Sequence, residues 1–145
     1  MIMTGSSMKN SDSVFVDTSA LYALINRSDI DHGRAIDCLS SLSDGNTSLI
    51  TSNFILSETY TLILYKIGRT TALRVINGIR ESYEIERISL KDEENAWQII
   101  TDFDDKNFSY VDATTFAIMT RLGLGEVFSF DDHFNQYPEI QKIPG

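Results

Sequence analysis

The chain has 145 residues, 42% of them hydrophobic and 23% charged, which is the size and composition of one globular domain with its own core. Its net charge of −9 argues against broad, salt-driven binding along nucleic acid, and no apolar run approaches the ~20 residues that span a bilayer. The only cysteine is Cys38 and the only histidines are His32 and His133, which excludes an intrachain disulfide and a zinc site built from several Cys and His ligands.

Residues 1–13 are polar and contain no apolar stretch of the kind found in secretory signals, so we expect a disordered leader there. Residues 14–145 contain no linker, internal repeat or low-complexity tract and are predicted to form a single domain. A lone cysteine suits a reducing compartment, and the predicted location is the cytoplasm.

The first predicted strand, residues 14–16, is a short β-prone apolar run that stops at Asp17. A helix is expected over 19–27, with Thr18 or Ser19 as its cap and Asp17 as an alternative cap. Periodicity and turn residues then predict five more helices, over 32–42, 53–67, 70–82, 90–103 and 110–122, and strands over 48–51, 84–88, 127–130 and 140–143. Strands that alternate with helices of about three turns predict a parallel sheet covered on both faces, a three-layer α/β/α sandwich.

Four carboxylates fall where such a sheet gathers ligands. Asp17 and Asp131 each follow a predicted strand, Asp112 lies in the first turn of a helix behind Ser109, and Glu58 interrupts an almost wholly apolar helix. Each also has an ordinary explanation: a helix cap for Asp17 and Asp112, a turn for Asp131 and a solvent-facing rim position for Glu58. If the four converge, each close pair repels by about 4 kcal/mol at 4 Å and an effective dielectric of 20, so they must bind protons or a divalent cation. Ligation by oxygen atoms favours Mg²⁺ or Mn²⁺.

The segments around these acids are Val-Phe-Val-Asp17-Thr-Ser-Ala, Ile-Leu-Ser-Glu58-Thr, Phe-Ser-Tyr-Val-Asp112-Ala and Phe-Ser-Phe-Asp131-Asp-His-Phe. In this order and spacing they resemble the PIN-domain family, and within it the VapC-like ribonuclease toxins of toxin–antitoxin modules. The resemblance runs from about residue 14 to 143 and implies a PIN-like α/β/α fold with a central parallel sheet. It also implies a metal-dependent endoribonuclease that hydrolyses phosphodiester bonds of RNA with Mg²⁺ or Mn²⁺, often a homodimer, inhibited by a cognate antitoxin.

The catalytic and metal-binding residues that this resemblance implies are Asp17, Glu58, Asp112 and Asp131, with family hydroxyls matched at Thr18 and Ser109. A PIN-type RNA-processing nuclease without an antitoxin stays open as an alternative. A receiver domain also gathers acids and Mg²⁺, but receivers usually show paired acids after the first strand and a lysine after a late one, and neither is present here. A non-catalytic module that retains the fold and docks a partner is a third alternative.

Three further expectations concern single features. Trp97 lies with Ile100 and Phe103 on one predicted helix and is expected to pack in the core. A phosphate contact is one interpretation of His133, but it is expected to be a surface residue near a turn. The helix over 54–65 has more apolar surface than one core face requires, so we expect it to contribute to a homodimer interface.

Overall fold

A five-stranded parallel sheet forms the centre of the computed structural model, which describes residues 12–145. The strand order is β3-β2-β1-β4-β5, and every neighbouring pair is parallel. The central strand β1 (Ser13–Val16) lies between β2 (Ser48–Ser52) and β4 (Glu126–Phe128), while β3 (Glu84–Glu86) and β5 (Gln141–Ile143) form the edges. Because all strands point the same way, their carboxyl ends meet at one edge of the sheet.

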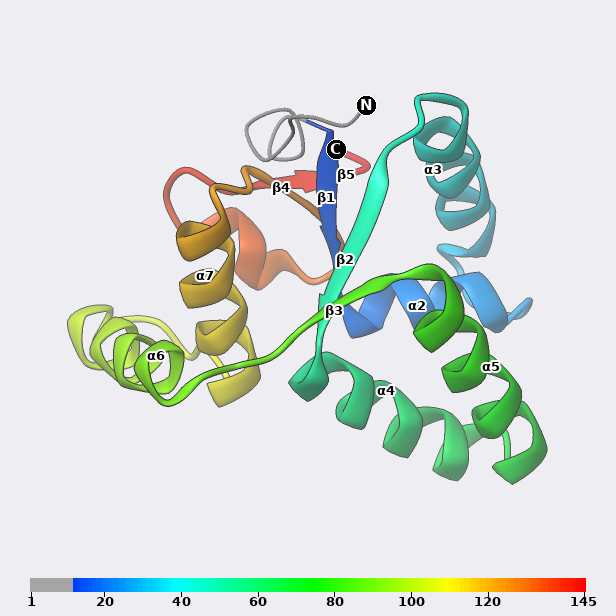
Figure 1. Ribbon diagram of the computed structural model, residues 1–145, viewed down its shortest axis with the longest axis horizontal. Coiled ribbons are helices and arrows are strands. Elements are labelled where there is room, and N and C mark those ends of the chain that lie inside the picture. The colour runs from blue at the N-terminus through cyan, green and yellow to red at the C-terminus, as the bar shows by residue number, and fades with distance from the viewer. Residues whose placement is uncertain (1–11) are drawn as a thin grey trace.

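Helices cover both faces of this sheet. They are α2 (Thr18–Ile25), α3 (His32–Asp44), α4 (Asn53–Lys66), α5 (Arg69–Ser82), α6 (Leu90–Asp102) and α7 (Tyr110–Leu122). Figure 1 shows α6 and α7 on one side of the sheet, α3 and α5 on the other, and α4 running beneath the carboxyl end of β2. The three-layer α/β/α sandwich predicted from the sequence is therefore confirmed.

Serine caps define three of the helix starts. Ser52 caps α4, Ser89 caps α6 and Ser109 caps α7, each by accepting a hydrogen bond from the backbone N–H three residues on. Of the caps considered for α2, the alternative, Asp17, is the one present, and Thr18 and Ser19 lie inside the helix. A carboxylate serves there because its Oδ2 can accept from the Ser19 N–H.

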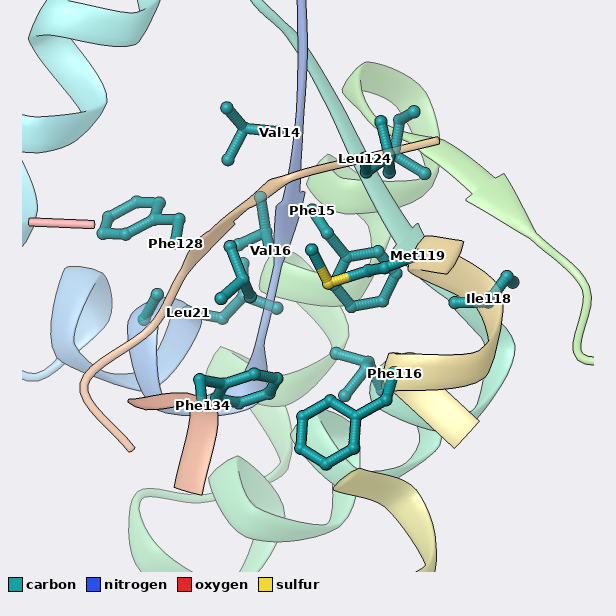
Figure 2. Packing of buried hydrophobic residues seen from close by; sticks show 14 of the residues in the cluster. Val14, Phe15, Val16, Leu21, Phe116, Ile118, Met119, Leu124, Phe128 and Phe134 are labelled. Carbon is teal, nitrogen blue, oxygen red and sulfur yellow. The ribbon is translucent and has the colours of Figure 1, made fainter. Parts of the chain in front are cut away.

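The core lies between the central strands and α7 (Figure 2). Phe116 of α7 is fully buried and stacks on Tyr137 with ring centroids 4.3 Å apart, while Phe108 and Phe134 meet it edge-on at 4.8 and 5.4 Å. Phe116 lies one helical turn after Asp112, and Phe134 lies three residues after Asp131. This aromatic cluster therefore fixes the two segments that carry these acids.

Trp97 does not pack in the core as expected and is 59% exposed. The buried side of α6 is formed by Asp92 and Ala96, with Ile99, Ile100 and Phe103 half-buried beyond them. Trp97 is the next residue after Ala96, which turns it about 100° away from that side. The expectation was wrong because Trp97 and Ile100 are three residues apart, and residues at this spacing can lie on adjacent stripes of a helix as well as on the same one.

The expected leader falls mostly on residues 1–11, which lie outside the described residues, while Ser13 is already the first residue of β1. Within residues 12–145, none of the helices has the length and apolar character needed to cross a membrane.

Candidate functional site

One cleft of about 280 Å³ at the carboxyl edge of the sheet is lined by all four carboxylates singled out in the sequence. Its lining residues are Asp17, Thr18, Ser19, Glu58, Leu62, Ser109, Asp112, Asp131 and His133. They come from the first turn of α2, the middle of α4, the start of α7 and the turn after β4. The fold thus brings together acids that are up to 114 positions apart in the chain, from 17 to 131.

Asp17 is the most deeply set of these acids, with only 5% of the residue exposed. Its Oδ2 atom accepts hydrogen bonds from the hydroxyls of Ser19 and Ser129, both at 3.0 Å. Burial raises the pKa of Asp17 from 3.8 to about 6, the serine hydrogen bonds work against this rise, and the charge of Glu58 adds to it. A positive charge in the cleft would favour the ionised form.

The same two serines shape the turn after β4. Ser19 Oγ accepts from the Phe130 N–H at 2.9 Å, and Ser129 Oγ accepts from the Asp131 N–H at 3.0 Å. The strand expected over 127–130 therefore ends at Phe128. The Ser129 N–H still bonds to the neighbouring strand, but the N–H groups of Phe130 and Asp131 donate to side-chain oxygens and not to the sheet. Asp131 consequently lies three residues beyond the strand, where it caps a short 3₁₀ helix, Asp132–Gln136.

Glu58 is exposed to the cleft and held by a pair of threonines. Thr59, which is fully buried, donates from Oγ1 to Thr18 Oγ1 at 3.1 Å, and Thr18 donates in turn to Glu58 Oε1 at 2.7 Å. Because the Thr18 oxygen accepts from Thr59, its own proton is directed at the glutamate. The core side of α4 is formed by Ile55, Thr59 and Ile63, so a single stripe of this apolar helix is buried within the described chain.

Asp112 and Asp131 meet at His133. Asp112 Oδ2 accepts from the Ser109 N–H at 3.0 Å, which completes the predicted capping box, and lies 2.8 Å from His133 Nδ1. Since a carboxylate only accepts, Nδ1 carries the proton in this contact. Asp131 Oδ1 accepts from the His133 N–H at 2.9 Å. One potential ligand atom from each of these three residues lies within 4.8 Å of the others.

The four carboxylates share one feature among the described residues: one oxygen is held by the protein and the other has no hydrogen bond. The held atoms are Asp17 Oδ2, Glu58 Oε1, Asp112 Oδ2 and Asp131 Oδ1. The remaining oxygens, Asp17 Oδ1, Glu58 Oε2, Asp112 Oδ1 and Asp131 Oδ2, are available to a ligand. A set of fixed, oxygen-donating anions is the chemistry that hard divalent cations prefer.

Three residues of this site were not assigned to it from the sequence. His133 was expected at the surface but lines the cleft, and Ser129 and Thr59 were given no role although both are buried and hydrogen-bonded to site residues. The signal for Ser129 was its position two residues before Asp131, and the signal for Thr59 was a hydroxyl beside Glu58. By contrast, Asp132 points away, with 86% of its side chain exposed and Lys142 3.6 Å distant.

Comparison with known proteins gives one family and several relatives. The family model described as PIN domain matches residues 14–140. The 23S rRNA-specific endonuclease VapC20 of Mycobacterium tuberculosis is 36% identical over 133 residues, which cover 90% of this chain and 98% of that protein. Its crystal structure, described as that of a Sarcin-Ricin loop cleaving toxin, matches with a TM-score of 0.77 at 33% identity, over 85% of this chain and 93% of that one. VapBC2 from Rickettsia felis, solved bound to a DNA fragment from its promoter, shares the fold with a TM-score of 0.72 at 13% identity, over 90% of this chain and 96% of that one.

Proposed function

Because the chain belongs to the PIN-domain family, we propose that it is a metal-dependent endoribonuclease and the toxin of a toxin–antitoxin pair. The observation that carries this proposal is the single cleft lined by Asp17, Glu58, Asp112 and Asp131, each with one oxygen fixed and one available. Such an arrangement suits phosphodiester hydrolysis when the acids hold a cation. Negative charge builds up on the phosphate during the reaction, and the acids alone would repel it.

The donor set fits a divalent cation. We assign the ligand role to the four carboxylates and name Mg²⁺ or Mn²⁺ as the cation, since all four donors are hard oxygens. When bound, such a cation lowers the pKa of a coordinated water and neutralises charge on the phosphate. The raised pKa of Asp17 supports this assignment, because burial makes an isolated negative charge unfavourable there.

The protein's own contribution is to hold these groups in place. Ser19 and Ser129 fix the Asp17 carboxylate and the turn that carries Asp131, so the two acids keep one relative position. Thr18 orients Glu58, and the Ser109 N–H orients Asp112. His133 donates to Asp112 from Nδ1. In the imidazolium form its second ring nitrogen also carries a proton, which it can donate to the phosphate or the leaving group.

We propose RNA as the substrate, and ribosomal RNA as the first target to test. The support is the 36% identity, over nearly the full length of both chains, to an enzyme specific for 23S rRNA. That relative's structure is described as that of a toxin that cleaves the Sarcin-Ricin loop. The proposed location is the cytoplasm, where such RNA is found.

Two partners are part of the proposal. The first is an antitoxin that places an arginine or lysine among the four available carboxylate oxygens, since an arginine fork can bridge two carboxylates. The second is another copy of this chain. Tyr65 at the end of α4 is 82% exposed, and Ile67 just after the helix and Leu73 near the start of α5 are also exposed, which gives this part of the chain apolar surface.

The decisive experiment is cleavage of purified 23S rRNA and of single-stranded RNA with Mg²⁺ or Mn²⁺ and with EDTA. We expect defined cuts that need the metal and that are lost in the Asp112→Asn variant. The matched control is Asp132→Asn, which removes a neighbouring acid outside the cleft and should leave cleavage unchanged. Equal cleavage in EDTA would refute the metal-dependent mechanism. To test the toxin role, the protein is expressed in a bacterial host, where it should arrest growth unless the antitoxin is co-expressed.

A further inference from the structure

An apolar groove lies directly beside the acidic cleft, between α4 and α7. Phe54, Ser57, Glu58, Thr61, Leu62 and Val111 line it, and its volume is about 600 Å³. Glu58 and Leu62 line both the groove and the cleft, so the two form one continuous surface. Figure 1 shows the beginnings of α4 and α7 close to each other at this end of the molecule. Any chain that places a phosphate among the acids must therefore place its neighbouring groups along or near this groove.

Helical spacing builds this surface. Phe54, Glu58 and Leu62 follow one another at intervals of four residues and so form one row along α4. On the opposite wall, Val111 immediately precedes Asp112 in α7. Each acid thus has an apolar neighbour on the side that faces the groove.

An aromatic pair ends the groove. The rings of Phe54 and Tyr110 are nearly parallel, with an interplanar angle of 27° and centroids 6.4 Å apart. Tyr110 is 41% exposed, and its hydroxyl donates to Glu93 Oε1 at 2.8 Å, which fixes the ring in this position. A ring that is both exposed and fixed loses little rotamer freedom when a planar group stacks on it.

The charges at this surface determine what can bind. Within the part of the chain that the structure describes, neither the cleft nor the groove is lined by a lysine or an arginine. Phosphates flanking the scissile one therefore gain no cationic partner here, and the net charge of −9 opposes them. Apart from the proposed metal ion, affinity for RNA at this surface must come from uncharged contacts, and base stacking on aromatic side chains supplies them independently of charge.

We propose that this groove, which we call the α4–α7 groove (Phe54, Leu62 and Val111, with Tyr110 at its end), is a base-binding subsite. It receives an unpaired nucleobase next to the scissile phosphate and stacks it on the Phe54–Tyr110 pair. This inference rests on the proposed ribonuclease function and adds to it that the substrate must present an unstacked base beside the cut. The subsite selects for single-stranded or looped RNA by shape and stacking.

The test uses RNA stem-loops that span a mapped cut, with the base on either side of the scissile phosphate removed in turn. Phe54→Leu keeps apolar volume but removes the aromatic face, and Tyr110→Leu does the same at the second ring. The controls, Trp97→Ala and Leu90→Ala, remove large exposed side chains that line neither the groove nor the cleft. On intact RNA, kcat/KM should fall by about 5- to 150-fold in the leucine variants and less than about twofold in the controls. The RNA without the stacked base should be cleaved equally well by the leucine variants and by unaltered protein, because the stacking contact is already lost.

A spectroscopic measurement tests binding separately from cleavage. With 2-aminopurine at the same position and EDTA present, fluorescence should be quenched by saturating unaltered protein and not by the Tyr110→Leu variant. Equal losses on intact and abasic RNA, together with no quenching, would overturn the base-binding subsite while leaving the nuclease function intact. Full activity of the leucine variants on RNA, combined with weaker binding of the antitoxin, would also overturn it and assign the groove to the protein partner. If unaltered protein cleaves no RNA, the proposed function fails, and the fluorescence measurement still decides whether a base binds.

Discussion

Replacing Asp17 with asparagine should stabilise the protein at neutral pH when no metal is present. The substitution keeps the shape of the side chain, and the amide oxygen can still accept from the hydroxyls of Ser19 and Ser129. It removes the buried negative charge, which is the cause of the raised pKa. Asp17, although proposed to be essential for activity, is therefore expected to lower the free energy of unfolding.

The size of this effect follows from the pKa. In the unfolded chain Asp17 titrates near 3.8, and in the folded protein near 6, a rise of about two units that corresponds to about 3 kcal/mol at about 1.4 kcal/mol per unit. Because the folded pKa is the higher one, the folded protein binds more protons between these values and its stability falls as pH rises from 3.8 to 6. The cost is complete above pH ~6 and is about 1 kcal/mol near pH 4.5.

Urea unfolding in EDTA measures this difference directly. Relative to unaltered protein, Asp17→Asn should be more stable by about 3 kcal/mol near pH 7.5 and by about 1 kcal/mol near pH 4.5. The control Asp132→Asn changes an exposed acid and should stay within about 0.5 kcal/mol at both values. Saturating Mg²⁺ should stabilise unaltered protein by about 3 kcal/mol at one hundred times its Kd, and Asp17→Asn by much less. An Asp17→Asn variant that is less stable than unaltered protein at both pH values would refute the burial argument.

Three other substitutions test separate parts of the structure. Thr59→Val removes the hydroxyl that directs the hydrogen bond to Glu58, so we expect kcat to fall about tenfold in RNA cleavage with little change in stability, while Thr59→Ser stays near normal. Arg121→Met removes the two hydrogen bonds that Arg121 donates to the buried carboxylate of Asp92, and urea unfolding near neutral pH should show a loss of about 2–3 kcal/mol. Burial acts to raise the pKa of Asp92, but the hydrogen bonds from Arg121 and Ser89 lower it overall, so that loss should shrink as pH falls below 3.8. Tyr65→Glu should convert a homodimer to a monomer in light scattering at tens of micromolar, and a monomeric unaltered protein would contradict the proposed interface.

Much of the fold could be predicted from local signals. The start of α7 could be predicted from Ser109, because a hydroxyl that accepts from a free N–H is a strictly local interaction. The alternation of strands and helices was enough to place the carboxyl ends together. The end of β4 could not be predicted, because it depends on Ser19, which is more than one hundred positions away and takes over the hydrogen bond of the Phe130 N–H.

The site shows the same division. Four acids could be singled out from the sequence because each lies at a strand end, at a helix start or within an apolar helix. In the structure all four line one cleft. Their catalytic and metal-binding roles stay a prediction until the substitutions are made. The role of His133 could not be predicted from the sequence, since its contact with Asp112 exists only when the turn after β4 packs against the start of α7. Trp97 shows the reverse error, in which a local spacing was taken for a tertiary contact.

The distribution of hydrogen bonds connects activity with inhibition. The protein fixes one oxygen of each of the four acids, so the remaining oxygens form a preset anionic surface. Burial is the main cause of the raised pKa of Asp17, and repulsion by the charge of Glu58 adds to it. Whatever relieves that repulsion gains free energy without reorganising the site, and a metal ion and an arginine side chain can both do so. They would use the same four oxygens and must therefore compete. An antitoxin acting in this way should bind more weakly as Mg²⁺ rises, and by linkage it should weaken metal binding by the same factor.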